Sequence, residues 1–412
     1  MNKLIWKNSA WLWIANIFIK IVAFFYNIFL AQSLGVDNFG IYVVALSYFS
    51  LISAVADLGI SRFLIREAQT DEKNLNQYLP AAIVTRSVIL IILFVVFSVG
   101  LYTLDPDINR SLVSVLALLA VLPQGISLTL DASLIASFKA KYSSIGFLFL
   151  SFFTTLAGVW FISSGFGVYG AALALLVGQF FYALILVLLL NSQKISWLNG
   201  FSWKTVKILL SGSLPYGILG ILGLLYFRVD TILLSYLRGN FEAGIYGAAY
   251  KFLEAIVFIP GTLAAMMFPV LAKLQVEDLS KIKKIYLKNT LVMGVVGIIF
   301  ALGFILVLPI VITLLLPSYV LSIDTVKILA LAIPFMFLHV PAAQVLLSSE
   351  KYLKPIMLFS IIPLSFNVLL NLALIPVFGY TAAAWVTVFS DILSAVILFT
   401  FIQFVFFKKN NV

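Results

Sequence analysis

Three long stretches of the chain contain no charged residue, and they set the hydrophobic pattern of the whole sequence. They cover residues 142–193, 289–323 and 355–390, which are 52, 35 and 36 positions long. A transmembrane helix needs about 20 apolar residues, so each stretch predicts two spans in succession. Breaks rich in glycine, proline or serine divide them, at residues 163–167, 309–317 and 375–379. Helices and closed barrels are the structures that satisfy the backbone in lipid, and runs of this length predict helices.

The same pattern, followed along the whole chain, predicts twelve membrane-spanning helices. Residues 1–31 combine a basic start with an apolar stretch, but Lys20 at its centre favours a retained first span over a signal peptide. The twelve predicted spans cover residues 10–33, 40–65, 80–103, 111–135, 144–163, 168–190, 207–236, 243–272, 287–309, 319–346, 355–375 and 380–406.

The lysine and arginine residues indicate the orientation of these spans. Twenty of the 26 cations fall at the gaps on one side, including Arg86 and the C-terminal pair Lys408 and Lys409. The opposite gaps contain Arg110 and Arg238. Because cytoplasmic loops carry the excess of positive charge, both termini are predicted to be cytoplasmic.

Composition agrees with a membrane protein and narrows the chemistry. The chain is 63% hydrophobic and 10% charged, with a mean hydropathy of +1.14, whereas soluble domains contain about 25% charged residues. The chain has no cysteine and one histidine, which excludes disulfides and argues against a resident metal. The net charge of +10 is explained by membrane-flanking loops and lipid headgroups, so we expect no nucleic-acid partner and no bound cofactor.

An internal repeat divides the predicted spans into an N-terminal lobe of residues 1–200 and a C-terminal lobe of residues 201–412. Residues 30–42 resemble residues 233–246, Lys141 and Tyr142 match Lys351 and Tyr352, and residues 166–172 match residues 378–384, at offsets of 203–204, 210 and 212. Six spans per copy is an even number, which predicts two parallel six-helix lobes related by an axis along the membrane normal, with a cleft for alternating access between them.

The loops argue against an enzyme. The predicted outer gaps at residues 36–39, 164–167 and 377–379 are short, whereas a polysaccharide polymerase or ligase is expected to carry a sizeable outer loop. The chain also lacks the Gly-x-x-x-x-Gly-Lys sequence that cradles nucleotide phosphates.

Ionisable residues inside the predicted spans are the candidate functional residues, because a charge at bilayer depth costs at least ~2.5 kcal/mol unless it is paired or hydrated. Lys20, Arg228 and Lys251 are the candidate substrate-binding cations, and a cleft of this charge favours an anionic substrate. The alternatives are a structural ion pair for Lys20 or Arg228, and an i,i+3 pair with Glu254 for Lys251.

Six further residues are candidates for coupling or gating. Their alternatives are structural: snorkelling for the interfacial pair, ion pairing or hydrogen bonding for the buried acids, and polar packing for the histidine. The six are Asp57, Arg62, Asp230, Glu254, His339 and Asp391. The sequence leaves the driving force open between a proton or sodium gradient, coupled at such a site, and consumption of the transported product outside.

Several motifs resemble those of the polysaccharide-biosynthesis flippases, of the O-antigen flippase type, within the multidrug/oligosaccharidyl-lipid/polysaccharide exporter superfamily. Residues 34–42 and 57–62 (Asp-Leu-Gly-Ile-Ser-Arg) are similar to the opening of that family. Residues 228–234, 244–250 and 268–269 resemble the start of its second half. The resemblance covers essentially the whole chain.

The resemblance implies a function. Members have two six-helix lobes around a cavity lined mainly by spans 1, 2, 7 and 8, and they move an undecaprenyl-pyrophosphate-linked oligosaccharide across the cytoplasmic membrane for O-antigen, capsule or exopolysaccharide synthesis. The expected partners are this lipid-linked substrate, membrane lipids, and a polysaccharide polymerase with its chain-length machinery. The alternative is a drug/cation antiporter of the same superfamily, although a cationic cavity argues against it.

Overall fold

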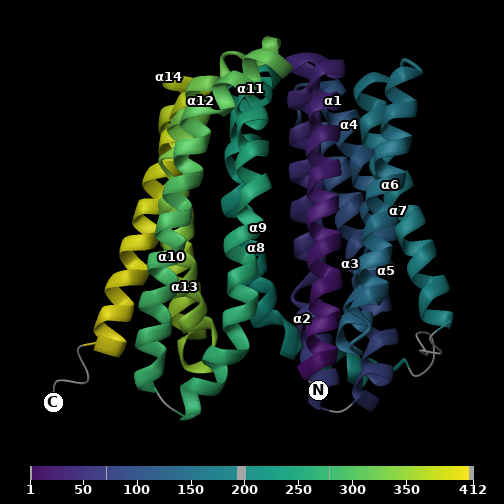
Figure 1. The fold of residues 1–412 in the computed structure, drawn as a ribbon. Helices are drawn as coiled ribbons and strands as arrows, with labels where there is room; N and C mark the ends of the chain where they lie inside the picture. Colours follow the sequence, from purple (N-terminus) through teal and green to yellow (C-terminus); the bar gives the residue numbers. More distant parts are fainter. Residues whose placement is uncertain (1, 71, 193–200, 278, 408–412) are drawn as a thin grey trace. The chain divides into compact units, whose positions relative to one another are not determined.

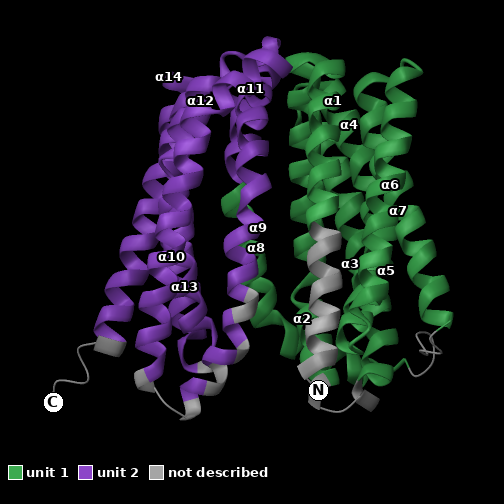
Figure 2. Ribbon diagram, viewed as in Figure 1, with its two compact units in different colours: residues 1–228 green, residues 229–412 purple. Residues whose placement is uncertain are grey.

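The computed structural model describes residues 2–70, 72–192, 201–277 and 279–407 (Figure 1). The described residues are helical almost throughout and include no β-strand. They form two compact units, residues 1–228 and residues 229–412 (Figure 2). The predicted division into lobes at residues 200 and 201 rests on the sequence repeat and stays a prediction.

The first unit contains seven complete helices and most of an eighth, whose last residues belong to the second unit. These helices are α1 (Asn2–Asp57), α2 (Ile60–Thr70), α3 (Glu72–Leu104), α4 (Ile108–Leu119), α5 (Val121–Ala136), α6 (Ala140–Ser163), α7 (Gly167–Ser192) and α8 (Trp203–Arg238).

Helix α1 consists of two helical segments joined at Gly35, which has non-helical backbone angles (φ 72°, ψ 172°). Glycine adopts a positive φ without the steric cost of a Cβ, so this break lies where the sequence predicts the turn between the first two spans. The second segment ends at Asp57 rather than at residue 65. Leu58 and Gly59 have positive φ values of 43° and 77°, and the chain then enters the short amphipathic helix α2.

Helix α4 begins at a turn that carries two aspartates. Asp107 caps the helix by accepting hydrogen bonds from the backbone N–H groups of Asn109 and Arg110, at 2.9 and 3.1 Å. Asp105 pairs with the buried Arg110 side chain. An Asp side chain at an N-cap satisfies backbone donors that have no partner inside the helix, so these residues stabilise a turn.

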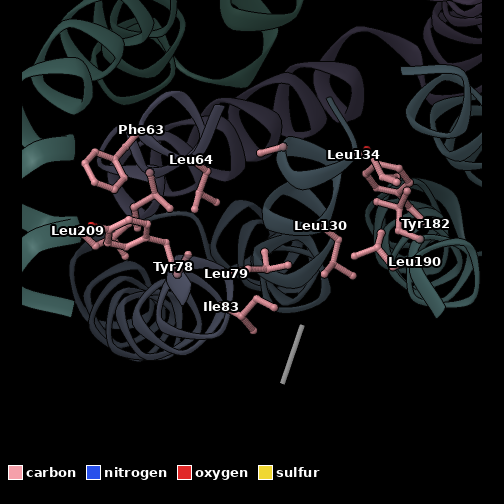
Figure 3. Packing of buried hydrophobic residues seen from close by; sticks show 14 residues of the cluster. Phe63, Leu64, Tyr78, Leu79, Ile83, Leu130, Leu134, Tyr182, Leu190 and Leu209 are labelled. Atoms are coloured by element: carbon pink, nitrogen blue, oxygen red, sulfur yellow. The ribbon is translucent and has the colours of Figure 1, made fainter. Parts of the chain in front are cut away.

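One hydrophobic cluster joins five helices of the first unit (Figure 3). It draws side chains from α2, α3, α5 and α7, and Leu209 places the beginning of α8 in the same core. Phe63 and Tyr78 meet edge to face with ring centroids 5.3 Å apart. The cluster comprises Ile60, Phe63, Leu64, Tyr78, Leu79, Ala82, Ile83, Leu130, Ala132, Leu134, Tyr182, Leu186, Leu190 and Leu209.

The second unit contains the end of α8 and the remaining helices. These are α9 (Asn240–Glu277), α10 (Leu279–Leu306), α11 (Leu308–Leu315), α12 (Ser322–Ala330), α13 (Ile333–Leu347) and α14 (Leu353–Ile402), with short helical turns at Pro317–Tyr319, Glu350–Tyr352 and Gln403–Phe407.

Helix α14 is also two segments, joined at Gly379 (φ 61°, ψ −143°). The carboxylate of Glu242 occupies the space that a Cβ on this glycine would need. It accepts a hydrogen bond from the backbone N–H of Tyr380 at 2.9 Å and pairs with Arg238 at 2.8 Å. The break between the two predicted spans is therefore held by a carboxylate from α9.

Among the described residues, nine helices are long and apolar enough to cross a membrane, or ten if the bent pair α12 and α13 forms one span. Helices α1 and α14 are counted once each, and each contains two of the predicted spans on either side of its non-helical glycine. The protein is a multi-pass, all-helical membrane protein. The number of twelve spans and the side on which the termini lie stay predictions.

Positive-φ glycines recur at the offsets of the predicted repeat. Gly35 and Gly239 are 204 residues apart, with φ values of 72° and 90°. Gly167 and Gly379 are 212 residues apart, with φ values of 53° and 61°. The two halves therefore have a positive-φ glycine at matching turns, which agrees with the repeat seen in the sequence.

Candidate functional site

A buried polar cluster lies where α1 gives way to α2 in the first unit. Arg86 on α3 is 1% exposed and forms an ion pair with Asp57, the last residue of α1. Its guanidinium also donates to Ser61 Oγ at 2.9 Å and to Thr129 Oγ1 at 2.8 Å. Ser61 donates in turn to Asp57 through its hydroxyl, at 2.8 Å, and its backbone N–H, at 3.2 Å. Asp57 therefore both neutralises Arg86 and caps α2.

Helix α8 packs closely against this turn. Gly59 faces the backbone of Ser213 and Gly217, and a Cβ on Gly217 would lie 2.6 Å from the Cα atom of Leu58. Arg66 on α2 donates a hydrogen bond to the hydroxyl of Tyr216 at 3.0 Å. The paired glycines bring the two backbones together, and the cluster around Asp57 fixes the turn that α8 contacts.

The remaining first-unit candidates lie on more open surfaces. Lys20 is exposed on α1, and Ile17, one helical turn before it, is 45% exposed. Arg62 is exposed on α2, and Arg228 is half-buried on α8. Lys20 is thus a cation on an otherwise apolar face, which is the setting expected for a charge that meets water or an anion at bilayer depth.

Asp230 is the centre of a second buried polar cluster, which lies within the second unit. The residue is 2% exposed. Its Oδ2 atom accepts hydrogen bonds from the hydroxyls of Tyr246 and Thr387, both at 2.9 Å, and its Oδ1 atom accepts from Asn371 Nδ2 at 2.7 Å. Asn371 Nδ2 also lies 3.0 Å from Asn367 Oδ1. Helices α8, α9 and α14 therefore surround one carboxylate with neutral groups.

The other second-unit candidates are distributed over three helices. Lys251 donates to Glu254 at 2.9 Å on α9, so the i,i+3 pair anticipated as the alternative is present and both charges are partly buried. His339 is half-buried on α13, and its Nδ1 atom has no hydrogen-bond partner. Asp391 is buried on α14. A shared cavity formed by Lys20, Arg228 and Lys251 stays a prediction, because the first two belong to one unit and the third to the other.

Two features of these clusters escaped the sequence analysis. Arg86, which lies within the predicted span of residues 80–103 and was assigned to its cytoplasmic end, is buried and paired with Asp57. The partners of Asp230 include Asn367, Asn371 and Thr387, all within the charge-free stretch of residues 355–390. In the sequence, the signal for this cluster was the pair Asn367 and Asn371, two amides one helical turn apart in an apolar run.

The amino-acid sequence matches a known protein family and one related flippase. A family model described as polysaccharide biosynthesis protein matches residues 5–275, more than half of the chain. The probable flippase AglR of Haloferax volcanii is 26% identical over 179 residues, which cover 42% of this chain and 37% of that protein.

Two solved structures share the fold. An inward-facing multidrug resistance MATE family transporter of the MOP superfamily superposes with a TM-score of 0.75 and 15% identity, covering 95% of this chain and 96% of that one. The lipid II flippase MurJ, in an inward closed conformation, gives a TM-score of 0.73 and 14% identity, covering 95% of this chain and 87% of that one. The predicted all-helical transporter fold is confirmed.

Proposed function

We propose, since the chain belongs to the polysaccharide biosynthesis protein family of flippases, that it moves a polyprenyl-pyrophosphate-linked oligosaccharide across the cytoplasmic membrane. The family match over residues 5–275 is the observation that carries this proposal. The membership confirms the resemblance drawn from the motifs at residues 34–42 and 57–62. The transported glycan would serve a cell-surface polysaccharide such as O-antigen, capsule or exopolysaccharide, and a polymerase with its chain-length machinery would use it.

The proposed mechanism is alternating access with a cationic path for the pyrophosphate. Lys20 supports it, because its ammonium group lies on an exposed apolar face where an anion is a favourable partner. Arg228 can bind two phosphate oxygens at once through its planar guanidinium. Lys251 is a weaker candidate, since Glu254 already accepts a hydrogen bond from it. The polyprenyl tail would remain in lipid while the headgroup crosses.

Transport of a fluorescent polyprenyl-pyrophosphate oligosaccharide into the opposite leaflet of proteoliposomes tests this function. Wild-type protein is compared with Lys20→Ala and Arg228→Ala, and Lys288→Ala serves as a matched control because Lys288 is an exposed lysine on α10 outside the proposed path. We expect flipping by the wild type and the control, and loss in the first two variants. Flipping that survives both substitutions would give these cations a structural role. No flipping by the wild type, together with uptake of a cationic drug, would favour the antiporter.

The proposed site of ion coupling is the cluster around Asp230. A buried carboxylate can accept a proton or hold a small cation, and its three partners come from two helices besides its own. A change of its charge would therefore alter contacts among α8, α9 and α14.

Flipping driven by an imposed sodium or proton gradient tests the coupling. Asp230→Asn is expected to remove the acceleration by the gradient and leave slow flipping intact. The control is Asp324→Asn, which changes an exposed carboxylate on α12 and should keep the wild-type response. Asp391→Asn and His339→Gln examine the other coupling candidates in the same assay, and full acceleration in Asp230→Asn would exclude this residue.

A further inference from the structure

Asp131 in the first unit is a buried acid that the proposed transport mechanism does not use. It lies on α5 and is 6% exposed. Its chain neighbour Leu130 and, one turn on, Leu134 belong to the hydrophobic cluster, in which they lie with Tyr182 of α7 (Figure 3). An ionised carboxylate in such surroundings is expensive unless a partner neutralises it.

The partners nearest to this acid are neutral hydroxyls from two other helices. Ser143 on α6 and Tyr182 on α7 are the side chains that interact with it. Asp131 Oδ1, Ser143 Oγ and Tyr182 Oη have no hydrogen-bond partner outside this group. Three buried oxygens from three helices therefore lie together, and no cation of the described residues neutralises the acid among them.

The tyrosine is held in this position by its own packing. Its ring lies against Gly146 of α6, where a Cβ would come 2.8 Å from a ring carbon. The ring centroid is 5.1 Å from that of Phe147. The residue is 1% exposed, so its hydroxyl cannot turn to water and stays beside the acid.

The charge of Asp131 indicates which kind of ion could bind beside it. Arg86, on the neighbouring helix α3, directs its guanidinium to Asp57, Ser61 and Thr129. The acid therefore contributes one negative charge among neutral partners, and one positive charge balances it. A divalent ion would leave an excess positive charge in an apolar core, which is costly.

We propose that Asp131, Ser143 and Tyr182 form a binding site for a small monovalent cation, either a proton or a sodium ion. The carboxylate supplies the charge, and the two hydroxyls supply further oxygens. This site is separate from the cluster around Asp230, and its occupancy does not depend on which substrate the protein transports.

Two binding measurements on purified protein in lipid nanodiscs test the proposal without any transport assay. Infrared spectroscopy over a range of pH detects the C=O band of a protonated carboxyl, and binding of radioactive sodium gives the number of sodium ions per protein. Wild type is compared with Asp131→Asn, which keeps the size of the side chain but removes its charge, and with the exposed-carboxylate control Asp324→Asn. Thermal unfolding verifies that each variant is folded.

We expect Asp131→Asn to lose one component of the protonated-carboxyl band or one bound sodium ion, and the control to keep both. Loss of the band component identifies a proton, and loss of the sodium ion identifies sodium. Ser143→Ala and Tyr182→Phe are smaller changes, which should shift the band or weaken sodium binding severalfold while the protein stays folded. A spectrum and a sodium stoichiometry that are unchanged in Asp131→Asn would overturn the proposal, as would unchanged binding in both hydroxyl variants.

Discussion

The ion pair between Asp57 and Arg86 allows a stability prediction in which the two partners are not equivalent. Arg86 is 1% exposed, whereas the Asp57 side chain is 26% exposed. Replacing Asp57 with alanine leaves a buried guanidinium whose remaining partners are the hydroxyls of Ser61 and Thr129. Removing one partner of a buried pair costs about 3–5 kcal/mol, and we expect Asp57→Ala to fall in this range.

Replacing Arg86 should lower the free energy of unfolding by less than replacing Asp57. Arg86→Met removes the buried charge and fills a similar volume. The carboxylate of Asp57 then keeps two donors from Ser61 and part of its contact with solvent. Loss of hydrogen bonds to a charged group costs about 1.5–3 kcal/mol. The double variant has no unpaired charge, so it should be no less stable than Asp57→Ala alone, and the two single effects should not add.

The assay is unfolding of the purified protein in detergent, by heat and by denaturant, for the wild type and the three variants. The expected order of stability places Asp57→Ala at or near the bottom, with the double variant restored toward Arg86→Met. Additive losses, or a larger loss in Arg86→Met than in Asp57→Ala, would refute the argument that an uncompensated buried charge dominates. Ser50→Ala, on the preceding part of α1, is a control for a local hydroxyl contact.

Two glycine positions give further predictions. Gly217→Val should force α8 away from the turn before α2, at a cost of about 1–3 kcal/mol. Thermal unfolding of the purified variant measures this cost, and an unchanged unfolding temperature would contradict the close packing. Gly379→Ala combines a positive φ with a clash, so it should lower the unfolding temperature. Gly303→Ala, with open space around it, should leave that temperature nearly unchanged or raise it slightly.

The fold was predictable from the sequence because lipid imposes a strong rule on composition. The charge-free stretches and their breaks predicted helices, and the break at residues 375–379 contains Gly379, where α14 changes direction. The end of the second span was less predictable. Residues 57–65 are apolar enough to continue a helix, but Leu58 and Gly59 adopt positive φ values, and α8 packs against this turn. This contact joins residues about 150 positions apart, and no local pattern encodes it.

The sequence predicted single candidate residues, but not which side chains surround them. Asp230 stood out because a carboxylate in a span is costly. Its partners Tyr246, Asn371 and Thr387 are ordinary residues until the fold brings them together. The pairing of Arg86 with Asp57 was not predictable for a related reason: near the end of a span, a cation that reaches the interface and one that is buried with a partner have the same sequence context.

The two halves of the repeat have different residues at the position of the buried acid Asp230. At the offset of 204, Tyr246 corresponds to Tyr42, and Asp230 corresponds to Tyr26. The hydroxyl end of Tyr26 fills the space beside Gly158, and its oxygen has no hydrogen-bond partner. The matching backbone therefore supports an acid in one half and an aromatic residue in the other. The buried acid of the first half, Asp131, lies on a helix that contributes nothing to the cluster around Asp230, so each half would bind its cation through partners of its own.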